Sequence, residues 1–424
     1  MIVQRTEKHI LKCSDVMFEK LDHCCFLAKN LYNHANYVIR KQYIDDGTWL
    51  RYPELDKLLR ADSEYPDYKN MPNAVAAQQL LRYLDNAWSA FFTAIKDWKV
   101  NPGKYQGKPN PPDYKHKTRG RCPIYLTNQA CILREGYIVF PKAFDRIKVK
   151  VNFVNKSNVV NFLQTRILPR GNHIVLEFVY SEEVPETKED NERYLGIDIG
   201  VDNLAAVSNN VGLLFYLIDG KGLKSMNKYY NKLVAHYSSK LQNDQKNANK
   251  SNKQYMSKRL QRIHSKRNFK IDDYLHKASR WIINFAQENN INVIVVGKND
   301  LWKQKSNLGH TTNQTFVQIP HARFINMIKY KAEEFGIQVI EQEESYTSKT
   351  SFLDNEYPTK NDECVGRRIQ RGLLRSGESS GNQIINADSN GALQIIKKHN
   401  PNFKVTNLVE TRILLQTPKR INVT

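Results

Sequence analysis

One acid stands inside an otherwise apolar run of the chain. The segment YLGIDIG begins at Tyr194, and Asp198 is its only charged residue. The run predicts a buried strand, and a carboxylate in such a strand is costly unless it is paired or binds a metal. Two acids that meet at a strand of this kind can hold two divalent cations and hydrolyse a phosphodiester. On its own, the pattern also fits an aspartate that caps a turn.

The segments around and after Asp198 define the predicted fold class. Apolar runs of four to eight residues are typical of strands, and apolar residues at three- and four-residue spacing are typical of helices. The predicted elements are strands at 194–200, 204–208 and 213–218, a long helical region, a strand at 291–296, a helix at 320–335, a strand at 337–342 and a helix at 386–398. This is the element order of an α/β RNase H-like domain.

The N-terminal half has a different pattern. Residues 2–12 alternate like a strand, and 15–43 and 74–98 have helical spacing of apolar residues. Residues 101–122 are rich in Pro, Gly, Lys and Arg and predict a basic loop. The short apolar runs CPIYL, GYIVFPK, RIKVKVNF and HIVLEFVY then predict a small antiparallel barrel or sheet. A polar stretch with a proline, 181–193, is a plausible domain boundary.

The charge of the chain indicates a polyanionic partner. It has 64 Lys and Arg against 43 Asp and Glu, a formal net charge of +21. The segment from Lys221 to Arg280 contains sixteen Lys or Arg but only three Asp and no Glu, with tyrosines interleaved. Basic residues follow phosphates and aromatic rings stack on bases, although a solvated helical hairpin would have the same composition. The predicted nucleic-acid contacts here are Lys258, Arg259, Arg262, Lys266 and Arg267.

The sequence predicts that the protein resides in the reducing cytoplasm and has no membrane partner. Residues 1–15 are charged and lack an apolar signal core, and no segment has the roughly 18 apolar residues of a membrane span. The six cysteines are irregularly spaced and form no CxxC pair, which favours neither a disulfide framework nor a zinc site.

Four segments together resemble the TnpB family, the compact transposon-encoded nucleases related to type V CRISPR effectors. They are LGIDIGVDNLA, IHSKRNFKIDDYLHKASRWII, SYTSK at 345–349, and INADSNGALQIIKK. The resemblance implies a RuvC-type nuclease in which Asp198 and Asp388 bind Mg²⁺ or Mn²⁺. It also implies a strand-rich, barrel-like wedge domain interrupted by a helical recognition domain. The implied boundaries are 1–12 and 121–188 for the wedge, 13–120 for the recognition domain, 189–344 and 386–424 for the nuclease, and 345–385 for an inserted nucleic-acid-binding element.

The chain departs from the family pattern at two places. The family's second motif usually ends its strand with a Glu, but this strand ends in Gly297. The next strand runs beside it in an RNase H-like sheet and ends near two acids, so we expect Glu344, or Glu343 as the alternative, to supply the third carboxylate. The family also carries two CxxC pairs where 349–385 holds only Cys364, which predicts no zinc.

Without zinc ligands, the inserted element must fold by other means. We expect a small apolar core, with the basic side chains of the element facing DNA. The predicted core residues are Phe352, Leu353, Ile369, Leu373 and Leu374. The further predicted nucleic-acid contacts are Trp302, Lys303, Arg367, Arg368 and Arg371.

Three functions are compatible with these patterns. The first is an RNA-guided DNA endonuclease of a prokaryotic transposable element, whose partners are a guide RNA from the transposon end and double-stranded DNA with a short flanking motif. The second is an RNA-guided DNA-binding protein that does not cut, because Gly297 supplies no carboxylate. The third is a transposition factor that needs no guide.

Overall fold

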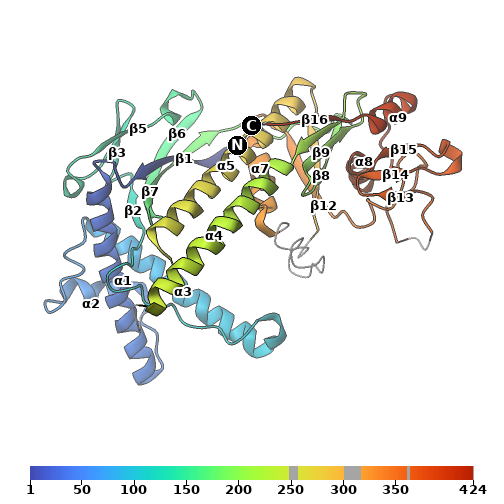
Figure 1. The fold of residues 1–424 in the computed structure, drawn as a ribbon. Coiled ribbons are helices and arrows are strands. Elements are labelled where there is room, and N and C mark those ends of the chain that lie inside the picture. Colours follow the sequence, from blue (N-terminus) through green and yellow to red (C-terminus); the bar gives the residue numbers. More distant parts are fainter. Residues whose placement is uncertain (248–255, 300–316, 361–362, 424) are drawn as a thin grey trace. The chain divides into compact units, whose positions relative to one another are not determined.

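The computed structural model describes residues 1–247, 256–299, 317–360 and 363–423 (Figure 1). The chain divides into two compact units, Met1–Glu183 and Val184–Thr424. The division lies inside the polar stretch 181–193. The placement of the units relative to one another is not determined.

The first unit contains two antiparallel sheets. One has the strand order β1-β7-β6-β2, and the other has the order β3-β4-β5. The strands are β1 (Ile2–Lys12), β2 (Ile124–Thr127), β3 (Ile132–Arg134), β4 (Tyr137–Val139), β5 (Lys148–Lys150), β6 (Val159–Pro169) and β7 (His173–Glu183). The sequence prediction omitted β6, because polar residues such as Asn161 and Arg166 interrupt its apolar ones without a strict alternation.

Three helices complete the first unit: α1 (Phe18–Asp46), α2 (Tyr52–Ala61) and α3 (Ala74–Val100). One face of α1 is buried, and its Asn36 accepts a hydrogen bond from the indole of Trp88 on α3 at 3.0 Å. The basic loop is fastened to α1 through its carbonyls. Lys29 donates to the carbonyl of Lys117 at 2.6 Å, and Asn33 donates to that of Lys115 at 2.8 Å.

The second unit is built on one mixed sheet with the order β12-β11-β8-β9-β10-β16. Its strands are β8 (Tyr194–Ile199), β9 (Asn203–Asn209), β10 (Tyr216–Asp219), β11 (Val293–Gly297), β12 (Gln338–Gln342) and β16 (Lys419–Ile421). Strands β8, β9 and β10 are antiparallel, whereas β11 and β12 run parallel to β8. The five strands β8 to β12 therefore have the RNase H-like order that the sequence predicted.

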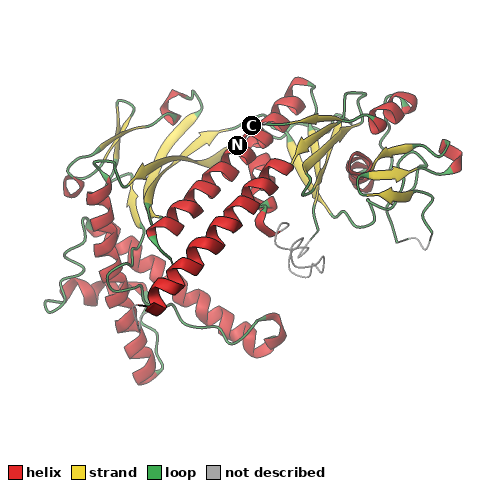
Figure 2. Cartoon of the chain, in the orientation of Figure 1, coloured by secondary structure: helices red, strands yellow, loops and turns green. Residues whose placement is uncertain are grey.

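Helices cover both faces of this sheet. They are α4 (Lys221–Asn247), α5 (Lys258–Glu288), α7 (His321–Glu333), α8 (Ala387–His399) and α9 (Leu408–Gln416). Residues of α5 and α7 share one core with Leu195 and Ile197 of β8, whereas residues of α8 share another with Tyr194. Successive strand residues point to opposite faces, so Gly196 and Asp198 lie on the α8 side. Helices α4 and α5 run side by side (Figure 2).

The inserted element forms a small sheet of its own, in the order β13-β14-β15. The strands are β13 (Arg367–Gln370), β14 (Leu373–Arg375) and β15 (Ile384–Asn386). Leu353 and Leu374 are buried, as predicted, but the prediction for Ile369 is wrong, because its side chain is 44% exposed. Within the described ranges, no helix is long and apolar enough to cross a membrane.

Candidate active site

Asp198 lies where helix α8 packs directly on strand β8. A Cβ atom at Gly196 would overlap the backbone carbonyl of Ala392, and one at Gly391 would be 2.8 Å from Oδ2 of Asp198. Glycine at both positions therefore removes the side chains that would hold the helix away from the strand. This close packing brings the first turn of α8 to the end of β8 that carries Asp198.

Asp388 is held in that first turn by two asparagines. Asn386 caps the helix, and its Oδ1 accepts hydrogen bonds from the backbone N–H groups of Asp388 and Ser389 at 3.1 and 2.9 Å. The side-chain amide of Asn203 donates to Oδ2 of Asp388 at 2.7 Å. The other oxygen, Oδ1, lies 3.9 Å from the guanidinium of Arg368.

Glu344 occupies the space that Gly297 leaves open at the end of β11. A Cβ atom at Gly297 would overlap Oε2 of Glu344. Asn299 holds the acid, because its amide donates to Oε1 at 3.2 Å and its Oδ1 accepts from the Glu344 N–H at 3.3 Å. Oε2 is buried and has no hydrogen-bond partner in the described part of the chain.

Glu343, the predicted alternative, makes a different set of contacts. It accepts hydrogen bonds from the backbone N–H and the hydroxyl of Ser345 at 2.7 and 2.9 Å, and it forms an ion pair with Lys398. Its side chain is 53% exposed. Of the two acids, Glu344 is the one against Gly297.

Burial and neighbouring charges raise the pKa values of Asp198 and Glu344. The pKa of Asp198 is raised well above its ordinary value, first by burial and then by the charges of Glu344 and Asp388, while Arg368 opposes the shift. Burial, followed by the charge of Glu343, raises the pKa of Glu344 to about 7, and Lys398 opposes that shift. Carboxylates in such surroundings favour a cation or a proton nearby.

The donor set fits a divalent metal, although the side chains are not assembled around one. Carboxylate oxygens are the ligands that Mg²⁺ and Mn²⁺ prefer, and the unpaired Oε2 of Glu344 is a buried acceptor of that kind. Among the described residues, no three His, Cys, Asp or Glu side chains form a ready-made metal site. Binding would therefore require at least some of these carboxylates to move toward a common point.

The predicted nucleic-acid contacts have different surroundings. Lys258, Arg259, Arg262 and Lys266 are exposed on α5. Arg267 instead ties parts of the fold together, because it donates to Asn227 at 2.9 Å and to the carbonyl of Gln318 at 2.7 Å. Two other members of the predicted set, Trp302 and Lys303, lie outside the described residues.

The three arginines predicted to contact nucleic acid in the inserted element lie on β13 and in the turn after it. Arg367, Arg368 and Arg371 are all exposed. Arg371 forms an ion pair of 2.6 Å with Asp202, in the turn between β8 and β9. The element thus brings positive charge to the sheet edge that carries the acids. The sequence predicted the positive charge of the element but not its position beside the acids.

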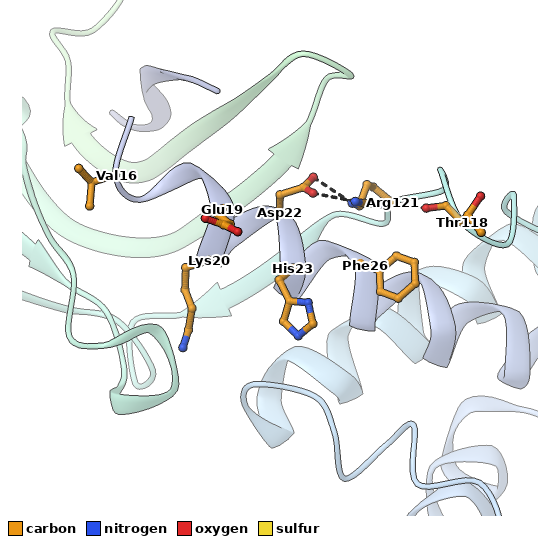
Figure 3. A pocket seen from close by; sticks show the side chains of 8 residues that line it. All are labelled: Val16, Glu19, Lys20, Asp22, His23, Phe26, Thr118 and Arg121. Atoms are coloured by element: carbon orange, nitrogen blue, oxygen red, sulfur yellow. Dashed lines mark hydrogen bonds and ion pairs between the residues drawn. The ribbon is translucent and has the colours of Figure 1, made fainter. Parts of the chain in front are cut away.

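A pocket in the first unit was not predicted from the sequence. It has a volume of about 690 Å³, and a paired Asp22 and Arg121, 2.7 Å apart, stand at its wall (Figure 3). It is lined by Val16, Glu19, Lys20, Asp22, His23, Phe26, Thr118 and Arg121. None of the three acids lines it, and mixed charges on a helix face carry no motif by which such a pocket could be found.

The fold and the acids define an RNase H-like α/β protein with an acidic site at the sheet edge. Residues 177–302 match the family model OrfB_IS605, described as a probable transposase, and residues 321–395 match the Cas12f1-like TNB domain. The two matches confirm the resemblance to the TnpB family. Asp198 lies in the first match, and Glu344 and Asp388 lie in the second. No curated protein sequence matches the chain.

Solved structures of type V effectors are weakly similar over most of the chain. A Cas12f1–sgRNA–target DNA complex has 14% identity and a TM-score of 0.34, covering 92% of this chain and 98% of its own. CasPhi-2 (Cas12j) bound to crRNA and phosphorothioate DNA has 8% identity and a TM-score of 0.41, covering 96% and 92%. The RNA-guided endonuclease Cas_phi3 has 10% identity and a TM-score of 0.40, covering 97% and 92%.

Proposed function

We propose that this chain is an RNA-guided DNA endonuclease of a transposable element, which cuts its target by two-metal phosphodiester hydrolysis at one RuvC-type site. The observation that carries the proposal is the carboxylate of Glu344 in the space above Gly297. It would supply a third acid beside Asp198 and Asp388, because Gly297 stands where the family motif usually has a Glu and would otherwise leave the site one ligand short. The confirmed resemblance to the TnpB family supports the same activity.

Each acid would enter the reaction from a fixed element of the fold. Asp198, Glu344 and Asp388 would hold Mg²⁺ or Mn²⁺, and the metal would activate a water and stabilise the leaving oxygen. The chain itself orients the ligands: Asn299 fixes Glu344, and the cap of α8 fixes the backbone of Asp388. Arg368 places a guanidinium at the same edge, where it can pair with a substrate phosphate.

The partners in this proposal are nucleic acids. The solved complexes with Cas12f1 and with Cas12j contain RNA and DNA. For this chain we propose a guide RNA transcribed from the transposon end and double-stranded DNA with a short flanking motif, met in the prokaryotic cytoplasm. The exposed cations of α5 supply phosphate contacts. The wedge and recognition domains proposed for 1–12, 121–188 and 13–120 would hold RNA and DNA.

The test is reconstitution with the RNA that the transposon end encodes. The protein should copurify with that RNA, and with Mg²⁺ it should linearise a plasmid that carries the matching target and a randomised flank. EDTA should stop cleavage. DNA affinity should fall with salt, with a log–log slope of about −0.9 for each duplex phosphate that is neutralised. Specific cleavage by a preparation free of RNA would favour the guide-independent transposition factor.

One observation favours a second candidate, a guided DNA-binding protein that does not cut. In the part of the chain that is described, the acids are not assembled into a metal site, and the raised pKa values of Asp198 and Glu344 favour their protonated forms. Such a protein would act by occluding its target. Two results together would identify such a binding protein. Guided binding should protect the target from a restriction enzyme, and no cleavage should occur across Mg²⁺ and Mn²⁺ titrations.

A further inference from the structure

Asn203 is the first residue of β9 and has a buried amide beside Asp388. Its side chain is 7% exposed overall. The Nδ2 atom donates to Oδ2 of Asp388 at 2.7 Å. Because a carboxylate only accepts, the NH₂ group and not the oxygen of the amide must face it, so the chemistry fixes the orientation of the side chain.

The orientation leaves the other atom of the amide without a partner. Oδ1 of Asn203 is buried and accepts no hydrogen bond from any residue that the structure describes. A buried acceptor left unpaired costs about 1–3 kcal/mol, and a leucine of similar size would avoid that cost. The unpaired oxygen therefore reduces what the Asn203 amide contributes to the free energy of folding.

We propose that Asn203 is a positioning residue of the acidic site. Its N–H holds Oδ2 of Asp388 and so fixes the rotation of that carboxylate, while Oδ1 accepts a hydrogen bond from a water in the site. The inference rests on the proposed metal-dependent site. It extends the site to strand β9, a strand that contributes no acid to it.

The neighbouring contacts distinguish this role from a merely structural one. Asn209, at the other end of the same strand, is 2% exposed. Its amide donates to the carbonyl of Leu213 at 3.1 Å, and its Oδ1 accepts from the N–H groups of Val211 and Leu213, each at 3.1 Å. Both ends of the Asn209 amide are thus used by the fold, whereas only one end of the Asn203 amide is.

The experiment measures Mn²⁺ binding and melting temperature on the full-length protein. Mn²⁺ affinity is read from the paramagnetic resonance signal of the free ion, so no cleavage is needed. Asn203→Leu should melt near the parent temperature, because it loses the unpaired buried Oδ1 together with the hydrogen bond to the partly exposed Asp388. It should bind Mn²⁺ about 10- to 100-fold more weakly, as expected for loss of a partner that orients a metal ligand. Asn209→Leu should show the opposite pattern, with a lower melting temperature and unchanged Mn²⁺ affinity.

Asn203→Ser serves if the leucine variant does not fold, because it keeps a hydroxyl donor in less volume and should bind Mn²⁺ with intermediate affinity. Parent-like Mn²⁺ affinity in the folded Asn203→Leu or Asn203→Ser protein would overturn the inference. If the parent itself binds no Mn²⁺, the inference and the proposed nuclease both fail. If the parent binds Mn²⁺ but does not cut guided targets, only the proposed nuclease fails, and Asn203 is still judged by affinity.

Discussion

The acids of the inserted element and the acids of the candidate site belong to the same unit but are used in opposite ways. Glu356 of the inserted element accepts hydrogen bonds from the backbone N–H groups of Ser351, Val365 and Gly366, at 2.6, 2.7 and 3.0 Å. Glu344 of the site accepts one from a side chain, and its Oε2 has none within the described residues. The fold thus supplies hydrogen-bond donors to both oxygens of Glu356, which we call a saturated acid. It leaves one oxygen of Glu344 without a donor among the described residues, and we call Glu344 an open acid.

The difference extends to how each acid titrates. Burial alone would raise the pKa of Asp354 in the inserted element, but hydrogen bonds from Ser351, from the Gly377 N–H and from other serines outweigh it and lower the pKa. At Glu344 nothing outweighs burial, and the pKa rises to about 7. Acids that bind backbone N–H groups hold loops together, whereas acids that lack such donors are available to a cation.

The largest expected effect is on cleavage by variants of the two aspartates that we propose as metal ligands. Asp198→Ala or Asp388→Ala should lower guided cleavage by about a thousandfold or more, because several kcal/mol of transition-state stabilisation depend on the metal ligands. Guided DNA binding should stay near the parent level. Cleavage at the parent rate by either variant would show that these acids do not form the active site.

A smaller effect distinguishes the two neighbouring glutamates. Glu344→Gln should lower cleavage by about a hundredfold, because a neutral amide is a weaker ligand than a carboxylate. Glu343→Gln is the matched control, since it changes the adjacent acid, which pairs with Lys398, and it should cut nearly as the parent does. Equal rates in parent and both variants would leave Glu344 without a role in the reaction.

The sequence predicted the sheet better than the inserted element. Asp198 breaks an apolar run and Asp388 opens a helix, but their role as metal ligands was predicted from the resemblance to the TnpB family. Glu344 could be placed because parallel strands end at the same edge of a sheet. The contacts of Glu356 could not be predicted, because they are made to backbone N–H groups in loops, which have no side-chain pattern.

Two other residues also depend on contacts that no local pattern predicts. Asn203 was not singled out, because a lone asparagine at a strand start is ordinary in sequence and gains meaning only from its 2.7 Å contact with Asp388. Ile369 was placed in the core on hydrophobicity alone, but it lies on an edge strand, where each β13 residue is exposed.

Replacing a saturated acid should lower the free energy of unfolding and leave cleavage unchanged. Glu356→Gln should destabilise the second unit by about 1–3 kcal/mol, because a carboxylate that accepts several N–H bonds is replaced by an amide with only one acceptor oxygen. Thermal or urea unfolding measures the change. Glu363→Gln, an exposed acid of the same element, is the control and should unfold like the parent. Destabilisation by both variants would point to charge alone.

The pH dependence of stability should have opposite signs for the two kinds of acid. Glu344 binds its proton more tightly in the folded than in the unfolded protein, because its pKa is raised to about 7. The stabilisation that comes from this protonated carboxyl is fully present below about pH 4.5 and is lost as pH rises through about 7. Glu344→Gln should therefore be more stable than the parent at pH 8, by on the order of 2 kcal/mol, and equal to it near pH 4.

Asp354 provides the opposite case in the same measurement. Its pKa is lowered in the folded protein, so its stabilisation is present above the ordinary pKa of 3.8 and is lost as pH falls through the lowered value. Asp354→Asn should thus be less stable than the parent at neutral pH. If both variants shifted stability in the same direction at pH 8, the distinction between open and saturated acids would be wrong.

The smallest expected effect is that of zinc removal, which should be none. A structural zinc needs four ligands, and residues 349–385 contain one Cys and no His. Glu356 and Asp354 already join the loops of this element through backbone N–H groups, so the fold has cross-links that a chelator cannot remove. Elemental analysis should find no stoichiometric zinc, and a zinc chelator should leave the melting temperature unchanged. One tightly bound zinc per chain, lost together with stability on chelation, would mean that a metal and not these carboxylates holds the element.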